Sequence, residues 1–262
     1  MTTGGCILRT LFSSTGHHRL TIGNQQSTLG NPMAPLYLAS SNPGKLREFR
    51  AAAAARGVTV ETLPRFAELP ACIEDGMTFE ENARKKAIHY SRISPGRVFA
   101  DDSGLCVDVL DGAPGIHSAR FAGTEATDEQ NNQRLLAELR RVETGTATNR
   151  NSKIETGNSM HPSRVPNFDF RVSPSSCHRS AHYICVIALA EAGHMVTIVE
   201  GRADGLILTE PKGAGGFGYD PYFFYPPLGK TFAEMLPEEK FVVSHRGVVF
   251  RKLLDYLCAR GQ

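Results

Sequence analysis

Short apolar runs alternate with helix-forming stretches along most of the sequence. The runs at residues 36–39 and 58–63 predict short strands. Residues 45–55 (KLREFRAAAAA) between them are strong helix formers, and Gly57 favours an end to that helix. The pattern therefore begins as strand, helix, strand.

The same interleaving continues further along the chain. Thr78, with Glu81 three residues later, forms a capping-box pattern and predicts a helix to about Ser91. Residues 97–110 (RVFADDSGLCVDVL) predict a strand, a turn and a second strand. Residues 127–140 carry acids early and arginines late, which suits a helix dipole.

The C-terminal part predicts a strand pair, a glycine-rich loop and a closing helix. The strands cover residues 183–190 and 195–208 around Gly193, and the amphipathic helix covers 244–259. Because strands and helices interleave, we expect an α/β fold with a mixed sheet.

Two stretches lack this pattern. Residues 1–33 contain almost no periodicity, and residues 1–31 have arginines and histidines but no acid. That composition resembles an organellar transit peptide, but we favour a disordered extension or a start codon upstream of the natural start at Met33.

Residues 143–179 are rich in Ser, Thr, Asn and Pro and cannot bury enough apolar surface to offset their ordering entropy. A linker between two domains is one interpretation. The apolar run after it needs partners on both faces, so we expect a mobile insertion within a single domain spanning 34–262.

Composition narrows the class of protein. A chain of 262 residues with 41% hydrophobic residues can bury a real core, and no apolar run approaches the length of a membrane span. A net charge of +2 argues against a nucleic-acid partner. The six cysteines lie far apart without a C-x-x-C pair, which predicts reduced thiols and a cytoplasmic location.

A polar turn after the first strand is a candidate anion site. Backbone N–H groups at a helix start attract anions, and Lys45 would add a full charge there. It is not a Walker A loop, because Leu46 follows the lysine. An ordinary turn with a solvated lysine is the alternative. The turn comprises Ser40, Ser41, Asn42, Pro43, Gly44 and Lys45.

The helix after Thr78 places Asn82 and Lys86 on one face, four residues apart. Lys86 can reach into a cleft there, although a solvated charged face explains it equally well.

Asp101 and Asp102 follow an apolar run. Strand residues alternate faces, so we expect one carboxylate to point into a site and the other to anchor the turn. Magnesium needs only one or two carboxylates when it bridges phosphates, and Glu74 is a plausible second ligand. A pair of turn-forming acids before Gly104 is the alternative.

Two later motifs complete the candidate site. The stretch GGFGYDPYFF presents Phe217 and Tyr219 for base stacking, with Asp220 as an acceptor for a ring N–H; an aromatic turn entering a strand is the alternative. The stretch EEKFVVSHRG presents donors suited to keto oxygens or phosphates. Its candidates are Lys240, Ser244, His245 and Arg246.

Together the stretches SSNPGK, FEENARKKA, ADDSGLCVDVLDGAPGIHSARFAG, GGFGYDPYF and EEKFVVSHRG resemble the inosine triphosphate pyrophosphatase family. The resemblance implies an elongated mixed sheet with two α/β lobes around a central cleft, a homodimer, a Mg²⁺ ion, and hydrolysis of ITP, dITP and XTP to monophosphate and pyrophosphate.

The resemblance also implies roles for residues. Glu74 and Asp102 would hold magnesium, and Asp102 or Asp101 would direct the attacking water. Lys45 and Lys86 would assist at the triphosphate. Substrate binding would involve Ser40, Ser41, Asn42, Pro43, Gly44, Lys45, Asn82, Lys86, Ser103, Phe217, Gly218, Tyr219, Asp220, Lys240, His245 and Arg246.

Two departures from the family pattern stand out: Ser40-Ser41 replaces a threonine-glycine pair, and the stretch after the helix at 127–140 looks foreign to the family. Two other functions stay open, a nucleotide-binding regulator without catalysis and a pyrophosphatase of the septum-formation-inhibitor type.

Overall fold

A computed structural model describes residues 34–148 and 179–260. The predicted extension at 1–33 and most of the predicted insertion therefore lie outside the described residues. The described chain forms a seven-stranded sheet in the order β2-β1-β3-β4-β5-β6-β7. The strands are β1 (Leu36–Leu38), β2 (Val60–Thr62), β3 (Val98–Val107), β4 (Ser180–Glu191), β5 (His194–Ile207), β6 (Phe223–Tyr225) and β7 (Lys230–Thr231).

The sheet is mixed, as the sequence predicts. Strand β1 runs parallel to β2 and β3, whereas β3 through β7 pair antiparallel. Strands β4 and β5 form a long hairpin whose turn, Ala192-Gly193, has positive φ at both residues (48° and 83°). That backbone favours glycine and matches the twist of the two strands.

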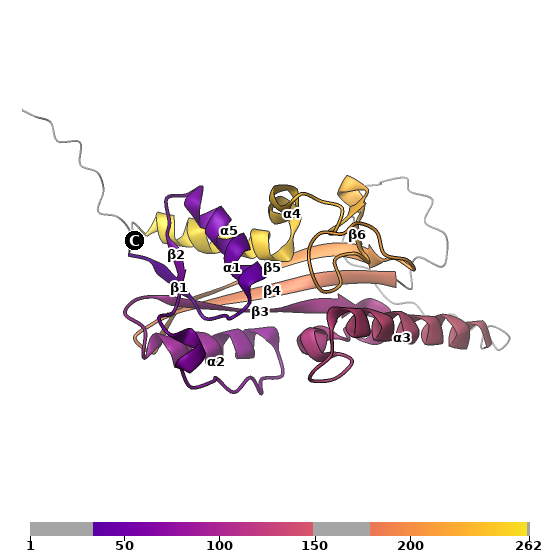
Figure 1. The fold of residues 1–262 in the computed structure, drawn as a ribbon, viewed down its shortest axis with the longest axis horizontal. Coiled ribbons are helices and arrows are strands. Elements are labelled where there is room, and N and C mark those ends of the chain that lie inside the picture. The colour runs from indigo at the N-terminus through magenta and orange to yellow at the C-terminus, as the bar shows by residue number, and fades with distance from the viewer. Residues whose placement is uncertain (1–33, 149–178, 261–262) are drawn as a thin grey trace, which may run out of the picture. The chain divides into compact units, whose positions relative to one another are not determined.

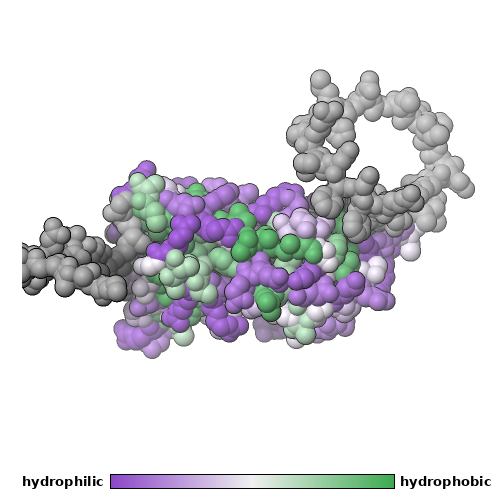
Figure 2. All heavy atoms as spheres, turned by 90° about the horizontal axis from the view of Figure 1, so that it is seen from above, coloured by the Kyte–Doolittle hydropathy of each residue, from purple (hydrophilic) through white to green (hydrophobic). Residues whose placement is uncertain are grey.

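Helices cover both faces of the sheet (Figure 1). Helices α1 (Pro43–Ala54), α4 (Pro237–Val243) and α5 (His245–Ala259) lie on one face, and α2 (Phe79–Ser91) and α3 (Asp128–Thr148) lie on the other. The face seen in Figure 2 is largely hydrophilic, with small apolar patches near its centre. Short 3-10 helices connect these elements: η1 (Phe66–Glu68), η2 (Asp108–Leu110), η3 (Gly115–Arg120) and η5 (Pro226–Leu228).

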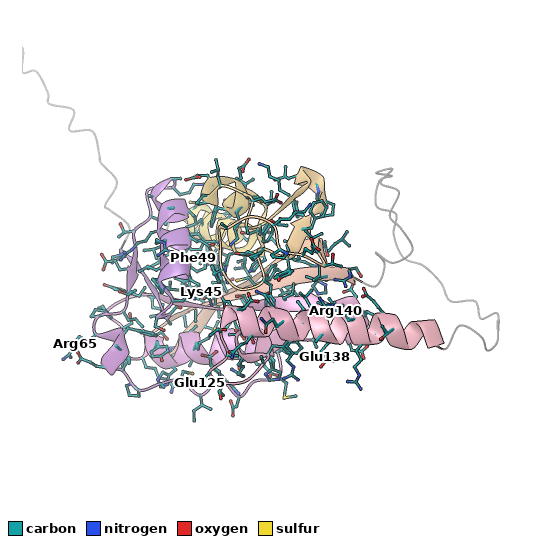
Figure 3. All side chains as sticks on the ribbon, turned by 45° about the vertical axis from the view of Figure 1, so that its right-hand side comes forward. Lys45, Phe49, Arg65, Glu125, Glu138 and Arg140 are labelled. Atoms are coloured by element: carbon teal, nitrogen blue, oxygen red, sulfur yellow. The ribbon has the colours of Figure 1, made fainter. Side chains whose placement is uncertain are left out.

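Aromatic packing fixes α1 and α5 on the sheet. The rings of Phe49 and Phe99 meet edge to face with centres 5.2 Å apart, and Phe250 of α5 packs 4.8 Å from Phe49. All three side chains are fully buried. Lys45 and Phe49 lie one turn apart on α1, so the same core that buries Phe49 also sets the position of Lys45 (Figure 3).

The predicted cap at Thr78 is confirmed, because its hydroxyl accepts from the Glu81 N–H at 3.1 Å. At the start of α5, Ser244 accepts from the Gly247 N–H and caps that helix. The second half of the predicted capping box is wrong. The Glu81 carboxylate accepts from the Met77 N–H instead of the Thr78 N–H.

Two element predictions are wrong. Residues 98–107 form one continuous strand with no turn at Asp101 and Asp102, because β4 pairs with every residue through that stretch. Helix α3 extends to Thr148, past the predicted end at residue 140 and into the predicted insertion. Within the described residues, no helix is long and apolar enough to cross a membrane.

Candidate active site

Strand β3 presents two neighbouring carboxylates to opposite faces of the sheet. Asp101 faces α1 and α5, where it contacts Lys45 and Arg246, whereas Asp102 faces α2. The strand alternation predicted this separation. No turn is involved, so the expectation that one aspartate anchors a turn is wrong.

Asp101 is a fully buried carboxylate surrounded by cations. The Lys45 Nζ lies 2.8 Å from its Oδ2, and the Arg246 Nε lies 3.7 Å from the same oxygen. Burial would raise the pKa of Asp101, but Lys45, Arg246 and Lys86 outweigh it and the net pKa is lowered. Asp101 is therefore ionised, and it orients two cations from separate helices.

The negative charge of Asp102 is offset less completely than that of Asp101. The Asp102 Oδ2 accepts from the Asn82 Nδ2 at 3.2 Å, and its Oδ1 accepts from the Ser103 N–H at 3.0 Å. Burial raises the pKa of Asp102, and the opposing effects of Lys86 and the Asn82 hydrogen bond do not cancel that rise. This carboxylate has room for a further positive charge.

Lys86 connects the backbone of Asp101 to the loop that carries Glu74. Its Nζ donates to the Asp101 carbonyl oxygen at 2.8 Å and lies 2.9 Å from the Glu74 Oε2. Burial would lower the pKa of Lys86, but Asp102, Asp101 and Glu74 raise it overall, so the ammonium stays charged. Asn82 and Lys86 share one buried helix face, as predicted.

An aromatic ring with two cations lies beside the aspartates. Lys240 and Arg246 each lie 5.0 Å from the centre of the Phe217 ring. The Asp220 Oδ2 accepts from the Lys240 Nζ and from the Phe217 N–H, at 2.7 and 2.8 Å. Burial raises the pKa of Asp220 despite Lys240.

One expectation for this region needs correction. Tyr219 is buried and donates its hydroxyl to the Ser118 carbonyl at 2.8 Å, so it is not an exposed stacking platform. Lys240 lies within α4. At the start of α3, Asp128 and Asn132 hold Gly218, one through its N–H and the other through its carbonyl oxygen.

His245 is fully buried, and neither ring nitrogen has a hydrogen-bond partner within the described residues. Its ring stacks on Tyr183 with centres 4.5 Å apart. Burial, Arg246, Lys240 and Lys45 together depress the pKa of His245 well below its ordinary value. The imidazole is neutral and can donate or accept one hydrogen bond from a ligand.

The polar turn before α1 is more occupied than the sequence suggests. The Asn42 Oδ1 accepts from the Gly44 and Lys45 N–H groups, at 2.8 and 3.1 Å. The expectation that these N–H groups are free to bind an anion is therefore wrong, because the Asn42 side chain already accepts from both. Ser40 accepts from the Asn42 N–H, while Ser41 and Pro43 are exposed.

A cavity of about 660 Å³ brings these groups together. All predicted site residues line it except Pro43, Gly44, Asp101, Lys240 and the capping residue Ser244. Asp101 and Lys240 act from behind this lining, through Arg246 and Asp220 respectively.

Sequence reasoning missed Glu48. Its carboxylate lies 3.4 Å from the Lys240 Nζ and 3.2 Å from the Arg246 Nη1, so it links α1 to both cations. The available signal was its position three residues after Lys45, on the same side of α1. Arg246 also donates to the Ser103 Oγ at 3.1 Å.

The donor set fits a hard divalent cation. Glu74 and Asp102 line one cavity with carboxylate oxygens, and Asp102 has an incompletely compensated charge. Within residues 34–148 and 179–260, no group of three or more His, Cys, Asp or Glu is arranged to hold an ion. Two carboxylates suffice for Mg²⁺, which keeps several waters and binds phosphate oxygens.

A sequence model of the Ham1 family matches residues 36–157 and 169–256. The chain belongs to the Ham1 family. The match confirms the family resemblance that the motifs indicate. Within the predicted insertion at 143–179, residues 158–168 fall outside the match and the rest lie inside it.

Ham1 relatives match most of the chain. A dITP/XTP pyrophosphatase of Geobacillus kaustophilus is 41% identical over 84% of this chain and 93% of its own. One of Desulfotalea psychrophila is 41% identical over 81% of this chain and 80% of its own. A solved HAM1 protein from Coxiella burnetii has a TM-score of 0.66 at 34% identity, covering 87% of this chain and all of its own.

Proposed function

We propose that this Ham1 protein is a nucleoside triphosphate pyrophosphohydrolase that converts ITP, dITP and XTP to the monophosphate and pyrophosphate. The observation that carries the proposal is the meeting, in one cavity, of cations from three helices, the Glu74 and Asp102 carboxylates and an aromatic ring. The names of the relatives, dITP/XTP pyrophosphatases, agree with it.

The phosphate chain would lie between α1 and α2. Lys45 and Lys86 approach the aspartates from opposite faces of the sheet, and both line the cavity. Fixed ammonium groups in a partly buried cavity stabilise the charge that develops on phosphate oxygens.

The base would lie against Phe217. Arg246 and the neutral His245 would offer donors to the keto oxygens of hypoxanthine or xanthine, since the guanidinium carries donors only. Glu48 and Asp220 would hold Arg246 and Lys240 in place.

Asp102 would act as the general base that takes a proton from the attacking water. The water oxygen would bond to the α-phosphorus, the bond from that phosphorus to the pyrophosphate oxygen would break, and the water proton would pass to Asp102. The raised pKa of Asp102 suits proton transfer, whereas Asp101 is fully buried between Lys45 and Arg246.

Glu74 and Asp102 would hold Mg²⁺, which supplies positive charge against the phosphate oxygens when bound. The same proposal includes a homodimer and a cytoplasmic location, which the family resemblance and the widely spaced cysteines favour. Sedimentation of the purified protein would test the dimer.

Product identification tests the proposed reaction. The protein is incubated with ITP, XTP, GTP and ATP, with and without Mg²⁺, beside Asp102→Asn. Monophosphate plus pyrophosphate from ITP and XTP, dependent on Mg²⁺ and lost in the variant, supports the proposal. Stepwise release of orthophosphate contradicts it, and tight binding without turnover indicates a nucleotide-binding regulator instead. Preference for other modified nucleotides would indicate the septum-formation-inhibitor type.

A further inference from the structure

The loop that carries Glu74 is fastened along the whole of α2. Each contact joins one loop residue to one helix residue, and the two segments run in opposite directions. The contacts are Pro70 O with His89 Nε2, Cys72 N with Tyr90 Oη, Glu74 with Lys86, Asp75 with Lys85, Gly76 N with Asn82 Oδ1, and Met77 N with Glu81 Oε2.

Asn82 differs from the other helix residues in this set, because its side chain also reaches the strand. Its Oδ1 accepts from the Gly76 N–H at 2.8 Å, and its Nδ2 donates to the Asp102 Oδ2 at 3.2 Å. The side chain is almost fully buried. One amide therefore joins the loop two residues after Glu74 to the carboxylate of Asp102.

We propose that Asn82 is a positioning residue that sets the separation and orientation of Glu74 and Asp102 for a divalent cation. This inference rests on the proposed function. In this inference the Asn82 amide positions the Glu74 and Asp102 carboxylates, whereas the family resemblance implies only that Asn82 binds substrate. The Asn82 amide can both accept from Gly76 and donate to Asp102, whereas a carboxylate at this position would have no donor at neutral pH.

Gly76 supports this assignment independently. A β-carbon at Gly76 would lie 2.6 Å from the Asn82 Oδ1 and 2.8 Å from the Glu81 Cβ, so the loop approaches α2 too closely for any side chain. Gly76→Ala would push the loop away from Asn82 without altering the amide itself.

The structure offers a matched control in Asn131 of α3. This asparagine is equally buried, accepts from the Ala122 N–H at 2.8 Å and donates to the Ala119 carbonyl at 3.2 Å. It fastens a loop to a helix in the same way and also lines the cavity, but it has no carboxylate partner among the described contacts. Loss of either asparagine removes the same kind of hydrogen bonds from a buried position.

The test measures Mn²⁺ binding by electron paramagnetic resonance, without nucleotide, in the wild-type protein, Asn82→Ala, Gly76→Ala and Asn131→Ala. Thermal unfolding of each variant confirms that it is folded. We expect the apparent Kd for Mn²⁺ to rise about 10- to 100-fold in Asn82→Ala and Gly76→Ala. Asn131→Ala should keep the wild-type Kd. Saturating Mg²⁺ should restore much of kcat in Asn82→Ala, since the ligands themselves remain.

Wild-type Mn²⁺ affinity in both Asn82→Ala and Gly76→Ala would overturn the inference, as would an equal loss in Asn131→Ala. A raised KM for ITP with unchanged Mn²⁺ affinity would show that Asn82 contacts substrate instead. Absence of Mn²⁺ binding by the wild-type protein would overturn the inference and the metal site together, whereas the products released from ITP decide the proposed reaction separately.

Discussion

Asp101 and Asp102 are neighbours in sequence, but the two faces of β3 give them opposite environments. On the α1 and α5 face, Lys45 and Arg246 hold Asp101 ionised and lower its pKa. On the α2 face, burial raises the pKa of Asp102 in spite of Lys86 and Asn82. One carboxylate orients the protein's own cations, and the other has charge left for a ligand. The comparison shows that strand alternation can give two consecutive carboxylates opposite electrostatic environments.

The largest expected effect is on activity, in Asp102→Asn. Removal of the proposed proton acceptor and metal ligand should lower kcat by roughly 10²- to 10⁴-fold. The free energy of unfolding at pH 7 should stay the same or rise, because burial disfavours this carboxylate. Steady-state kinetics and urea unfolding check the two halves. A large loss of stability would show that Asp102 is structural after all.

Asp101→Asn should have its main effect on stability. It leaves Lys45 and Arg246 without their buried partner, so we expect the free energy of unfolding to fall by about 3–5 kcal/mol. Urea unfolding at pH 7 measures it, with Asp255→Asn as a control, since the ion pair of Asp255 with Arg56 is exposed. Equal stability of Asp101→Asn and the wild-type protein would contradict the assigned difference between the two aspartates.

The pH dependence of stability tests whether burial and the neighbouring cations depress the pKa of His245. The pKa of His245 is depressed in the folded chain. Below about pH 6.5 its imidazole therefore binds a proton in the unfolded chain but not in the folded chain. The stability it supports is present above that pH and falls by about 1.4 kcal/mol per pH unit below it, until the folded pKa is reached. His245→Phe keeps the ring stacked on Tyr183 and should remove this part of the slope between pH 7 and pH 5. An unchanged slope in urea titrations would contradict it.

The smallest effect is expected for Lys85→Ala. Lys85 is next to Lys86 on α2, but its pair with Asp75 is exposed on both sides. The unfolding midpoint and the Mn²⁺ affinity should match those of the wild-type protein. A marked loss of either would show that the exposed Lys85–Asp75 pair contributes as much to stability or Mn²⁺ affinity as the buried contacts between the loop and α2.

Local signals in the sequence predicted the elements and the separation of Asp101 from Asp102. The Thr78 cap, the glycine turn at Gly193 and strand alternation depend on residues only a few positions apart, so the sequence displays them. The uninterrupted course of β3 was missed because its support comes from β4, which pairs Asp101 with Ile187 and Asp102 with Val186.

The site was predicted as a set of residues but not as a set of contacts. Asn42 caps the N–H groups that seemed free, and Tyr219 buries its ring, because each finds a partner that spacing alone does not reveal. Glu48 was missed for the same reason: both its partners, Lys240 and Arg246, lie far along the chain.

The most direct test of this account is Mn²⁺ binding, by electron paramagnetic resonance, to the wild-type protein, Asp102→Asn and Asp101→Asn at pH 7, below the unfolding transition of each. We predict that Asp102→Asn weakens Mn²⁺ binding by more than about tenfold, while a folded Asp101→Asn retains affinity near that of the wild-type protein. Unchanged binding in Asp102→Asn, or an equal loss in both variants, would contradict the claim that only the α2 face of β3 holds the cation.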